Sequence, residues 1–164
     1  MKLDNKGFTL VEVIVVVGII VLISIIAVPN VLRALNTGKN KSYDIMVQNI
    51  KTGAINLYEE VYSNKLLGDS ENVIYKYSEN GLKTGEKVEI SDDLSIVLNL
   101  QTLVSNGYLS GSASNNGVKT IYEPKENKPI GGCSISITRN VNNDRVTYTI
   151  TPINSGEGCP TSYN

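Results

Sequence analysis

Residues 5–29 read NKGFTLVEVIVVVGIIVLISIIAVP, an apolar run that carries one carboxylate near its start and a proline at its end. As an α-helix, residues 8–28 would rise about 31 Å, which matches the hydrocarbon thickness of a bilayer. Lys2 and Lys6 precede the run, so the N-terminus should stay in the cytoplasm and the rest of the chain should lie outside. The sequence therefore predicts a helix that can cross a membrane.

Two ordinary explanations of this run leave part of it unexplained. The apolar part of a secretory signal peptide is about 7 to 15 residues long and is followed by small residues at the cleavage site. This run is longer, and Ile25 stands two positions before Ala27, where a second small residue would be needed. A plain membrane anchor accounts for the length and the lysines but not for Glu12, because a carboxylate within a membrane helix is costly. Glu12 is therefore a candidate functional residue that needs a partner.

The segment resembles the N-terminus of type IV prepilins and of the related pseudopilins. In that family a short basic leader ends in glycine, and Phe-Thr-Leu-x-Glu, an apolar stretch and a proline follow it. Here the leader is Met1 to Gly7, the next motif is Phe8-Thr9-Leu10-Val11-Glu12, and Pro29 stands at the end of the apolar stretch. The likeness is specific over residues 5–29 and only general beyond them.

The resemblance implies a processing site and an assembly site. A membrane prepilin peptidase would cut between Gly7 and Phe8, where glycine lets the backbone enter a narrow active site, and Phe8 would then be N-methylated. Glu12 would pair with the N-terminal amine of a neighbouring subunit, because an unpaired carboxylate in an apolar filament core is costly. Pro29 cannot donate to the carbonyl of Ile25, so we expect a kink or a melted turn there.

One position departs from the family pattern. Members often carry a glycine eight residues before the proline, where this chain has Val21, and its own glycine is Gly18. In assembled filaments of the family, the helix commonly loses its regular structure between that glycine and the proline. The point at which such melting would begin in this chain is therefore left open.

The resemblance also implies a function, a set of partners and a location. The function would be that of a structural subunit of a type IV pilus, used in adhesion, motility or related processes. The alternatives are a pseudopilin of a type II secretion or competence (DNA uptake) system and a minor or tip adhesin pilin. The partners would be prepilin peptidase, the assembly platform in the cytoplasmic membrane, minor pilins and further copies of the chain in a helical filament. The precursor would lie in the cytoplasmic membrane with its N-terminus inside, and the assembled subunit would lie in an extracellular pilus.

The composition of the whole chain argues against several other functions. Lys and Arg number 15 against 16 Asp and Glu, and the pI is about 5.5, so no basic field favours general nucleic-acid binding. The absence of histidine removes the commonest general base and the commonest zinc ligand. The sequence contains no phosphate-binding glycine loop, and no nucleophile can be given a histidine base. We therefore expect no enzyme activity, no cofactor and no metal.

After Pro29 a helical pattern resumes, although the poor helix formers of residues 36–40 interrupt it. Apolar residues then recur at three- and four-residue spacing. They are Tyr43, Met46, Ile50, Ala54, Leu57 and Val61. The first part of the helix, residues 8–29, is thus followed by an amphipathic continuation over residues 30–63, and Gly38 would allow a bend. Its apolar face should pack on a head formed by residues 64–164.

The resemblance implies the pilin fold for this head, an α+β domain in which the long helix packs on a small antiparallel sheet. Residues 64–90 hold a turn at Asn80-Gly81 and one short apolar run, so we expect a loop region with one small strand. Ser91-Asp92-Asp93 predicts the start of a short helix over about 92–106, with Ser91 as its cap. A calcium site at the paired aspartates is the alternative, but two adjacent acids without further oxygen ligands favour the helix start.

Two stretches near the C-terminus alternate with period two, which is typical of half-buried strands. They predict an antiparallel hairpin over residues 133–151, with a turn at residues 141–144. The side chains expected to face the helix are Ile135, Ile137, Val146, Tyr148 and Ile150.

The chain has two cysteines, Cys133 and Cys159. On an exported domain two cysteines predict one disulfide, and two buried free thiols are the alternative. A bridge would tie the C-terminal tail back to the hairpin and would stabilise the fold by about 3.5 kcal/mol on the chain-entropy model. Many members of the family close a C-terminal loop in this way, so the resemblance also implies the bridge.

Overall fold

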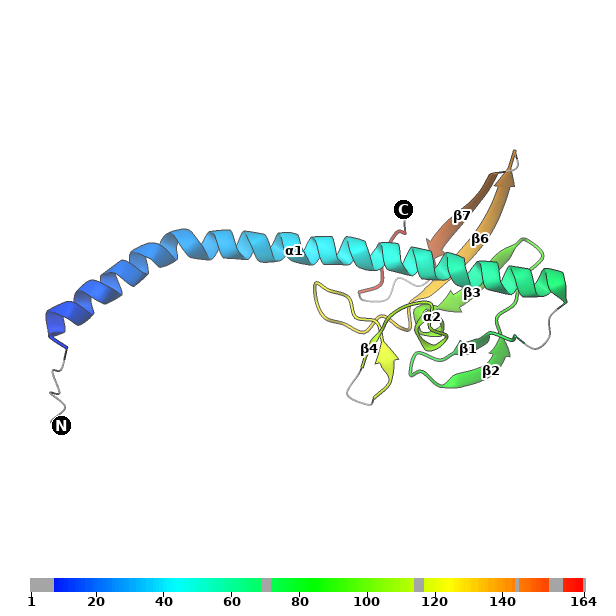
Figure 1. Ribbon diagram of the computed structural model, residues 1–164, viewed down its shortest axis with the longest axis horizontal. Coiled ribbons are helices and arrows are strands. Elements are labelled where there is room, and N and C mark those ends of the chain that lie inside the picture. Colours follow the sequence, from blue (N-terminus) through cyan, green and yellow to red (C-terminus); the bar gives the residue numbers. More distant parts are fainter. Residues whose placement is uncertain (1–7, 69–71, 114–116, 144, 154–157, 164) are drawn as a thin grey trace, which may run out of the picture. The chain divides into compact units, whose positions relative to one another are not determined.

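A long helix, α1 (Leu10–Leu67), opens the fold and is followed by short strands and one short helix (Figure 1). The computed structural model describes residues 8–68, 72–113, 117–143, 145–153 and 158–163. The chain divides into two units, Met1–Lys39 and Asn40–Asn164. The expected α+β class is confirmed, because the long helix is followed by small antiparallel sheets.

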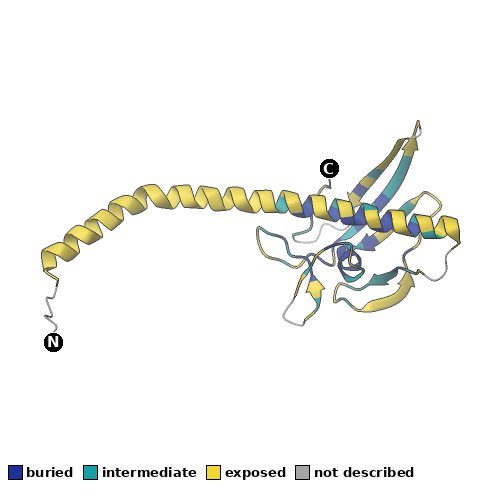
Figure 2. Ribbon diagram, in the orientation of Figure 1, coloured by how far each residue is buried: buried dark blue, intermediate teal, exposed yellow. Residues whose placement is uncertain are grey.

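The second half of α1 is helical because its sequence presents one apolar face at the period of 3.6 residues. The buried residues of this face are Met46, Val47, Ile50, Gly53, Ala54, Leu57, Tyr58 and Val61. Figure 2 shows this face on the part of α1 that lies against the strands. The expected apolar stripe is thus confirmed, although Tyr43 is only half-buried. The helix ends at Leu67 rather than near residue 63, and Gly68 follows at φ 65°, a conformation that suits a helix end.

The main sheet has three antiparallel strands in the order β3–β6–β7. They are β3 (Ser95–Asn99), β6 (Ser134–Asn142) and β7 (Arg145–Pro152). β6 and β7 form the hairpin expected near the C-terminus, with Ile137 opposite Ile150. Its turn contains Asn143 at φ 48°, while Asp144 lies outside the described residues.

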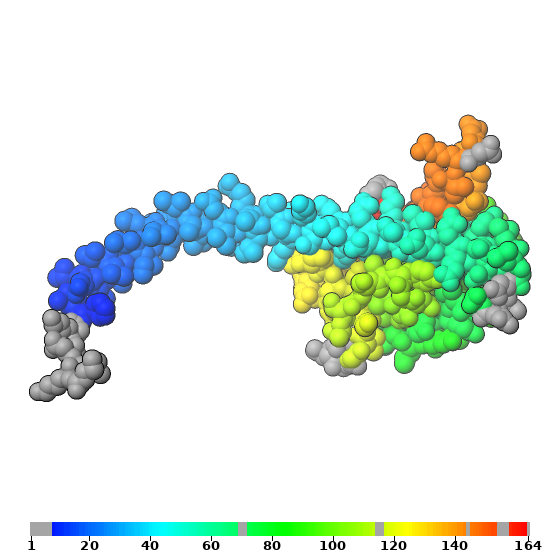
Figure 3. All heavy atoms as spheres, in the orientation of Figure 1, coloured from blue at the N-terminus to red at the C-terminus, as the bar shows by residue number. Residues whose placement is uncertain are grey.

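The inner face of this hairpin matches the expectation at its base but not at its tip. Ile135, Ile137 and Ile150 are buried, and the ring of Tyr148 meets that of Tyr58 edge-on with the ring centroids 5.4 Å apart. Val146, however, is 39% exposed. Figure 3 shows the end of the hairpin, in orange, standing clear of the neighbouring part of α1. Alternation along a strand predicts which way a side chain points, but it does not predict how far the covering helix extends.

Two small antiparallel pairs complete the sheets. β1 (Tyr75–Tyr77) pairs with β2 (Lys83–Lys87), and β4 (Ser112–Ala113) pairs with β5 (Lys119–Thr120). Residues 64–90 therefore contain two strands rather than the expected one. The second, β2, is exposed along its whole length and carries no apolar alternation, so its sequence lacks the usual strand pattern.

The helix expected over about 92–106 is wrong in its first half. Residues 95–99 form β3, and the helix α2 (Leu100–Ser105) begins only at Leu100. Its N-cap is Asn99, whose Oδ1 accepts a hydrogen bond from the N–H of Thr102 at 2.9 Å, and not Ser91. The expected end is correct, because Gly107 follows at φ 85° and donates to the carbonyl of Val104 at 3.1 Å.

The reason for this error lies in the pairing of β3 with β6. Ile96 and Leu98 stand opposite Ile137 and Ile135 and are buried with them. Apolar residues two apart can also fit an imperfect helical face, and here the cross-strand pairs decide between the two structures.

Residues 91–95 form a tight turn in place of the expected helix start. The carboxylate of Asp93 accepts hydrogen bonds from the hydroxyls of Ser91 and Ser95 at 2.6 and 2.7 Å. These donors hold the pKa of Asp93 below its ordinary value. Leu94 lies at φ 57°, and its carbonyl accepts from the Tyr58 hydroxyl at 2.8 Å and from the Arg139 N–H at 3.1 Å. These two contacts hold Leu94 in a conformation that is costly for a residue with a side chain.

Candidate processing and assembly site

The expected cleavage site lies at the border of the described residues. Gly7 and the rest of the leader, residues 1–6, lie outside the described residues. Of the two residues that flank the expected scissile bond, the structure therefore describes Phe8. Phe8 and Thr9 precede the first helical residue, Leu10, and Phe8 is 85% exposed. The residue after the expected cut is thus accessible and lies outside the helix.

Helix α1 begins with a capping box formed by Thr9 and Glu12. The N–H of Glu12 donates to Thr9 Oγ1 at 3.3 Å, and the N–H of Thr9 donates to Glu12 Oε2 at 3.0 Å. The Thr9 hydroxyl donates to the same Oε2 at 3.0 Å. A helix start leaves N–H groups without partners, and this reciprocal arrangement satisfies one on each residue. It explains why the helix starts at Leu10.

Thr9 is the residue of this site that the sequence reasoning missed. The signal was present, because Thr-x-x-Glu before an apolar run is the sequence pattern of a capping box. The charge of Glu12 predicts a partner in another chain, but it does not predict the bond that Glu12 makes within its own helix.

The carboxylate of Glu12 keeps one oxygen open to a further donor. Both contacts from Thr9 reach Oε2, whereas Oε1 has no donor within the described part of the chain. The ion pairs found there, Lys76–Glu86 and Lys128–Glu126, do not involve Glu12 either. Its neighbours Val11 and Val13 are apolar and more than half exposed. Glu12 can therefore hold its own helix start and still receive a donor from another chain.

The apolar run around Glu12 is exposed along its whole length. Every described residue from Phe8 to Ser42 is exposed, and the described residues include one helix, α1, with the length and apolar composition to cross a membrane. The polar side chains of Ser24 and Asn30 donate to the carbonyls of Ile20 and Ile26, at 2.7 and 3.0 Å. Polar groups satisfied within their own helix suit a lipid environment, where no water is available.

Pro29 lies inside α1, and the helix continues through it without interruption. Of the kink or melted turn expected there, a melted turn is not present, and Figure 1 shows α1 curved along its blue, N-terminal part. The proline still leaves the carbonyl of Ile25 without its intrahelical donor, because Pro29 has no N–H. This turn is therefore a local weak point of the helix, although it remains helical.

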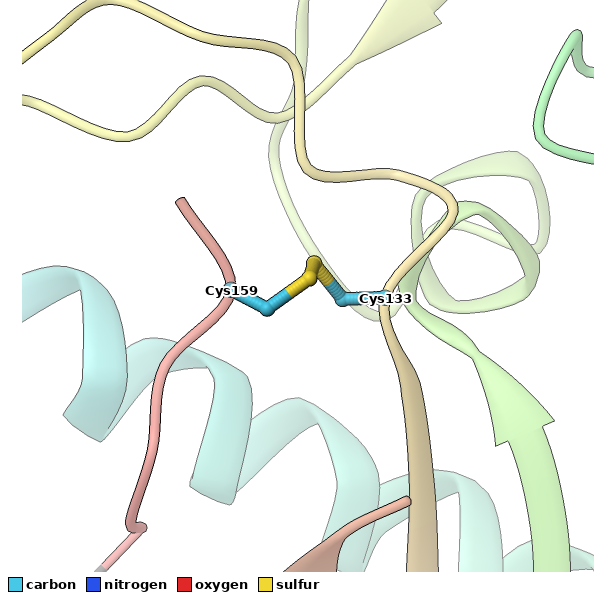
Figure 4. Close-up of a disulfide and its surroundings, with 2 residues drawn as sticks. All are labelled: Cys133 and Cys159. Atoms are coloured by element: carbon cyan, nitrogen blue, oxygen red, sulfur yellow. A yellow bond between two sulfur atoms is a disulfide. The ribbon is translucent and has the colours of Figure 1, made fainter. Parts of the chain in front are cut away.

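Cys133 and Cys159 form a disulfide, as expected, with their Cα atoms 5.7 Å apart. Figure 4 shows the bridge running from the chain just before β6 to the C-terminal segment. Cys133 is buried, and so are Pro160 and Tyr163, which follow Cys159 in the described tail and pack into the head. Burial raises the pKa of the Tyr163 hydroxyl. The bridge thus fixes a tail that also contributes to the core.

The expected site residues fall into separate groups. Phe8 lies just before α1 and Glu12 lies in its first turn, and Pro29 belongs to the same exposed stretch of helix. The cysteines belong to the other unit of the chain and stabilise its fold.

Comparison with family models identifies the prokaryotic N-terminal methylation motif over residues 2–28. The motif is the class III signal peptide of type IV pilins, and it describes a structural segment rather than an enzyme family. The match covers most of the leader, Gly7, Phe8, Glu12 and the apolar run, and it confirms the resemblance found in the sequence. Neither the curated proteins nor the solved structures give a match to this chain.

The motif implies processing by prepilin peptidase and assembly into filaments in general terms, and the apolar helix fits a membrane-anchored precursor. These features support a precursor of the type IV pilin-like or pseudopilin kind.

Proposed function

We propose that this chain is the structural subunit of a type IV pilus. In this proposal it is cut between Gly7 and Phe8, methylated on the amine of Phe8 and polymerised into a surface filament. The observation that carries the proposal is the methylation motif on a helix that is exposed over all 33 of its residues from Leu10 to Ser42. A helix needs about 20 residues to span a bilayer, so this exposed part is long enough to span it and to continue beyond it. So much exposed apolar surface needs lipid before assembly and other copies of the chain after it.

In this proposal, Glu12 supplies the carboxylate that pairs with the N-terminal amine of a neighbouring subunit during assembly. Cleavage would create a free amine on Phe8, and methylation would keep its positive charge while reducing its hydration. A neighbour's amine could then bind Oε1 of Glu12 while Thr9 keeps Oε2. In an apolar surrounding, a charge that lacks its partner is strongly disfavoured, so subunits that dock out of register are rejected. Glu12 therefore sets register as well as affinity.

Pro29 marks the turn of the same helix that can unwind or bend most easily. The missing hydrogen bond at Ile25 lowers the cost of unwinding this turn relative to any other turn of the apolar run. Unwinding or bending at this turn would help the helices of neighbouring subunits to pack tightly around a filament axis.

A pseudopilin of a secretion or DNA-uptake system, and a minor or tip pilin, are the alternative functions. The disulfide at the C-terminus favours a pilus subunit, because an extracellular filament benefits from a tail that cannot fray. The partners of a pilus subunit are prepilin peptidase, the assembly platform in the cytoplasmic membrane, minor pilins and other copies of the chain. Its final location is outside the cell.

The proposal is tested by the protein composition of filaments sheared from cells that produce the chain with its own assembly system. A major subunit dominates the sheared fraction, and replacing Gly7 with a bulky residue (Gly7→Val) removes the chain from that fraction and leaves the uncut precursor in the membrane. A chain that is a trace component of sheared filaments would be a minor pilin. A chain that stays in the membrane fraction of wild-type cells would be a pseudopilin or a plain anchor.

A further inference from the structure

Strand β7 forms an edge of the main sheet whose outer side is unpaired in the described part of the chain. Two hydrogen bonds fix which backbone groups point outward. The N–H of Arg139 donates to Leu94, towards β3, and the N–H of Ile153 donates to Ser134, towards β6. Because an antiparallel ladder alternates, the even-numbered residues of β6 bond to odd-numbered residues of β7. The N–H and C=O groups of Val146, Tyr148 and Ile150 therefore point away from the sheet.

The sequence of this edge lacks the charges and the proline with which proteins often protect an open strand. Residues 146–151 read VTYTIT, six residues of high β-propensity with no charge and no glycine or proline. Such a segment on an edge is a template for pairing with another strand. The first charged residue is Arg145 at one end, and Pro152 stands at the other.

The outer face of the sheet continues this uncharged surface. On β7 it carries Thr147, Thr149 and Thr151, which are exposed, and on β6 it carries Ser136 and Thr138, which are half-buried. No carboxylate or lysine on these positions would repel or select a partner by charge. A partner strand that is itself uncharged and rich in β-branched residues fits this edge best, and β7 of another copy has that composition.

We propose that β7 docks antiparallel against β7 of a second copy of this chain, with Tyr148 opposite Tyr148. In this register, Val146 faces Ile150 of the second copy, so every outward N–H in the stretch meets an outward C=O. Thr147 then stands opposite Thr149 of the second copy. Arg145 faces Thr151, so the two arginines do not oppose each other. A shift by two residues would bring Pro152, which has no N–H, opposite Val146 and leave a carbonyl unmatched.

A contact of this size is weak by itself. One strand pair buries far less than the roughly 1,200 Å² of a stable interface, so the isolated chain associates only at high concentration. The contact is two-fold symmetric, and a two-fold contact does not propagate along a helical filament. If the chain forms pili as proposed above, the contact joins neighbouring filaments, where many copies act together.

Single cysteines test the register in the full-length chain in detergent, with a mild oxidant and without need of filaments. One preparation carries Thr147→Cys and the other Thr149→Cys. Side chains opposite each other at a non-hydrogen-bonded pair have Cα atoms about 4.5 Å apart, within the range of a disulfide. In the same register, the Cα atom of residue 147 lies about 7–8 Å or more from that of residue 147 in the second copy, and the same holds for residue 149. This distance is too long for a disulfide. The mixture should give a cross-linked heterodimer at least tenfold above either preparation alone.

The matched control is a mixture of Ser136→Cys and Thr138→Cys chains, which carry cysteines on the same face but on the central strand β6. It should stay at background. Equal yields at all positions, or no excess in the Thr147 and Thr149 mixture, overturn the proposal. This outcome would leave the pilus function untouched, because that function is tested on sheared filaments.

Charge exchange gives a second test that adds no thiol. The double variant Thr147→Lys with Thr149→Lys places like charges opposite each other and should weaken self-association at least tenfold in sedimentation of the full chain. Thr147→Lys with Thr149→Glu places opposite charges together and should associate at least as well as the wild type. Equal association of the two variants contradicts antiparallel pairing at this edge.

Discussion

At the scale of single residues, one carboxylate at the start of α1 has an observed capping role and a proposed role in assembly. Glu12 closes the capping box with Thr9 through Oε2 and leaves Oε1 open. A helix that starts in the right place and a charge that a neighbour must neutralise are separate requirements. Glutamine can satisfy the first but not the second, because it caps a helix without carrying a charge.

We therefore predict that Glu12→Ala and Glu12→Gln both leave cleavage largely intact and both cripple filament assembly. Thr9→Val, which keeps the charge and removes the capping hydroxyl, should assemble far better than either. The measurement is the amount of chain in sheared filaments relative to processed chain in the membrane. A normal filament yield from Glu12→Gln would contradict the role proposed for the charge.

Gly53 gives a prediction about packing. A Cβ added there would lie 2.5 Å from the carbonyl oxygen of Tyr108, so the helix and the chain at Tyr108 approach too closely for any side chain. Gly53→Ala should destabilise the head by about 1–3 kcal/mol, although alanine is the better helix former. Chemical unfolding monitored by tyrosine fluorescence measures the change.

The matched control for Gly53 lies on the same helix. A Cβ added at Gly38 meets nothing within 4 Å. Gly38→Ala should therefore be neutral or stabilise by up to about 1 kcal/mol. Equal effects of the two substitutions would show that the contact with Tyr108 does not limit packing.

Asp93 gives a prediction about pH. The hydroxyls of Ser91 and Ser95 lower the pKa of its carboxyl from the ordinary value of 3.8. A lowered folded pKa contributes stability that is present above the unfolded pKa and is lost as the pH falls through the folded one. Wild type should thus exceed Asp93→Asn in unfolding free energy near neutral pH, and the difference should shrink in acid. A difference that stays constant from neutral pH to strong acid would sink this role of Asp93.

At the scale of elements, the sequence predicted those parts whose pattern is long and regular. The amphipathic part of α1 and the β6–β7 hairpin follow from their apolar periods, which are 3.6 and 2 residues. The local pattern of β3 also fits the first half of a helix, because the strand is only five residues long and its partner β6 stands far along the chain. β2 has no apolar alternation at all. Short strands held by distant partners cannot be predicted from a local pattern.

The disulfide gives the prediction at this scale. Cys133 and Cys159 are 26 residues apart, and opening a loop of this length should cost about 3.5 kcal/mol on the chain-entropy model, within a usual range of 2–4. Unfolding of the head with and without reductant measures the loss. The double variant Cys133→Ala with Cys159→Ala should be destabilised to a similar extent and should no longer respond to reductant. A response in the variant would show that the reductant acts elsewhere.

At the scale of the whole molecule, the chain combines an exposed apolar helix with a folded head that has its own core. In the head, the disulfide and the buried face of α1 were predictable from the sequence. In the N-terminal unit, the methylation motif covers Gly7, Phe8 and Glu12, as the resemblance implied, whereas the roles of these residues and of Pro29 stay predictions. The capping role of Thr9 was also predictable, because Thr-x-x-Glu before an apolar run is the sequence pattern of a capping box.

The central claim is that the chain is a processed pilin-like subunit, and the mass of its mature N-terminal peptide tests this most directly. Cells that contain prepilin peptidase should yield a chain that begins at Phe8 and carries one methyl group on its amine. A mature chain that still contains Met1 to Gly7, or one cut after Ala27, would contradict the account.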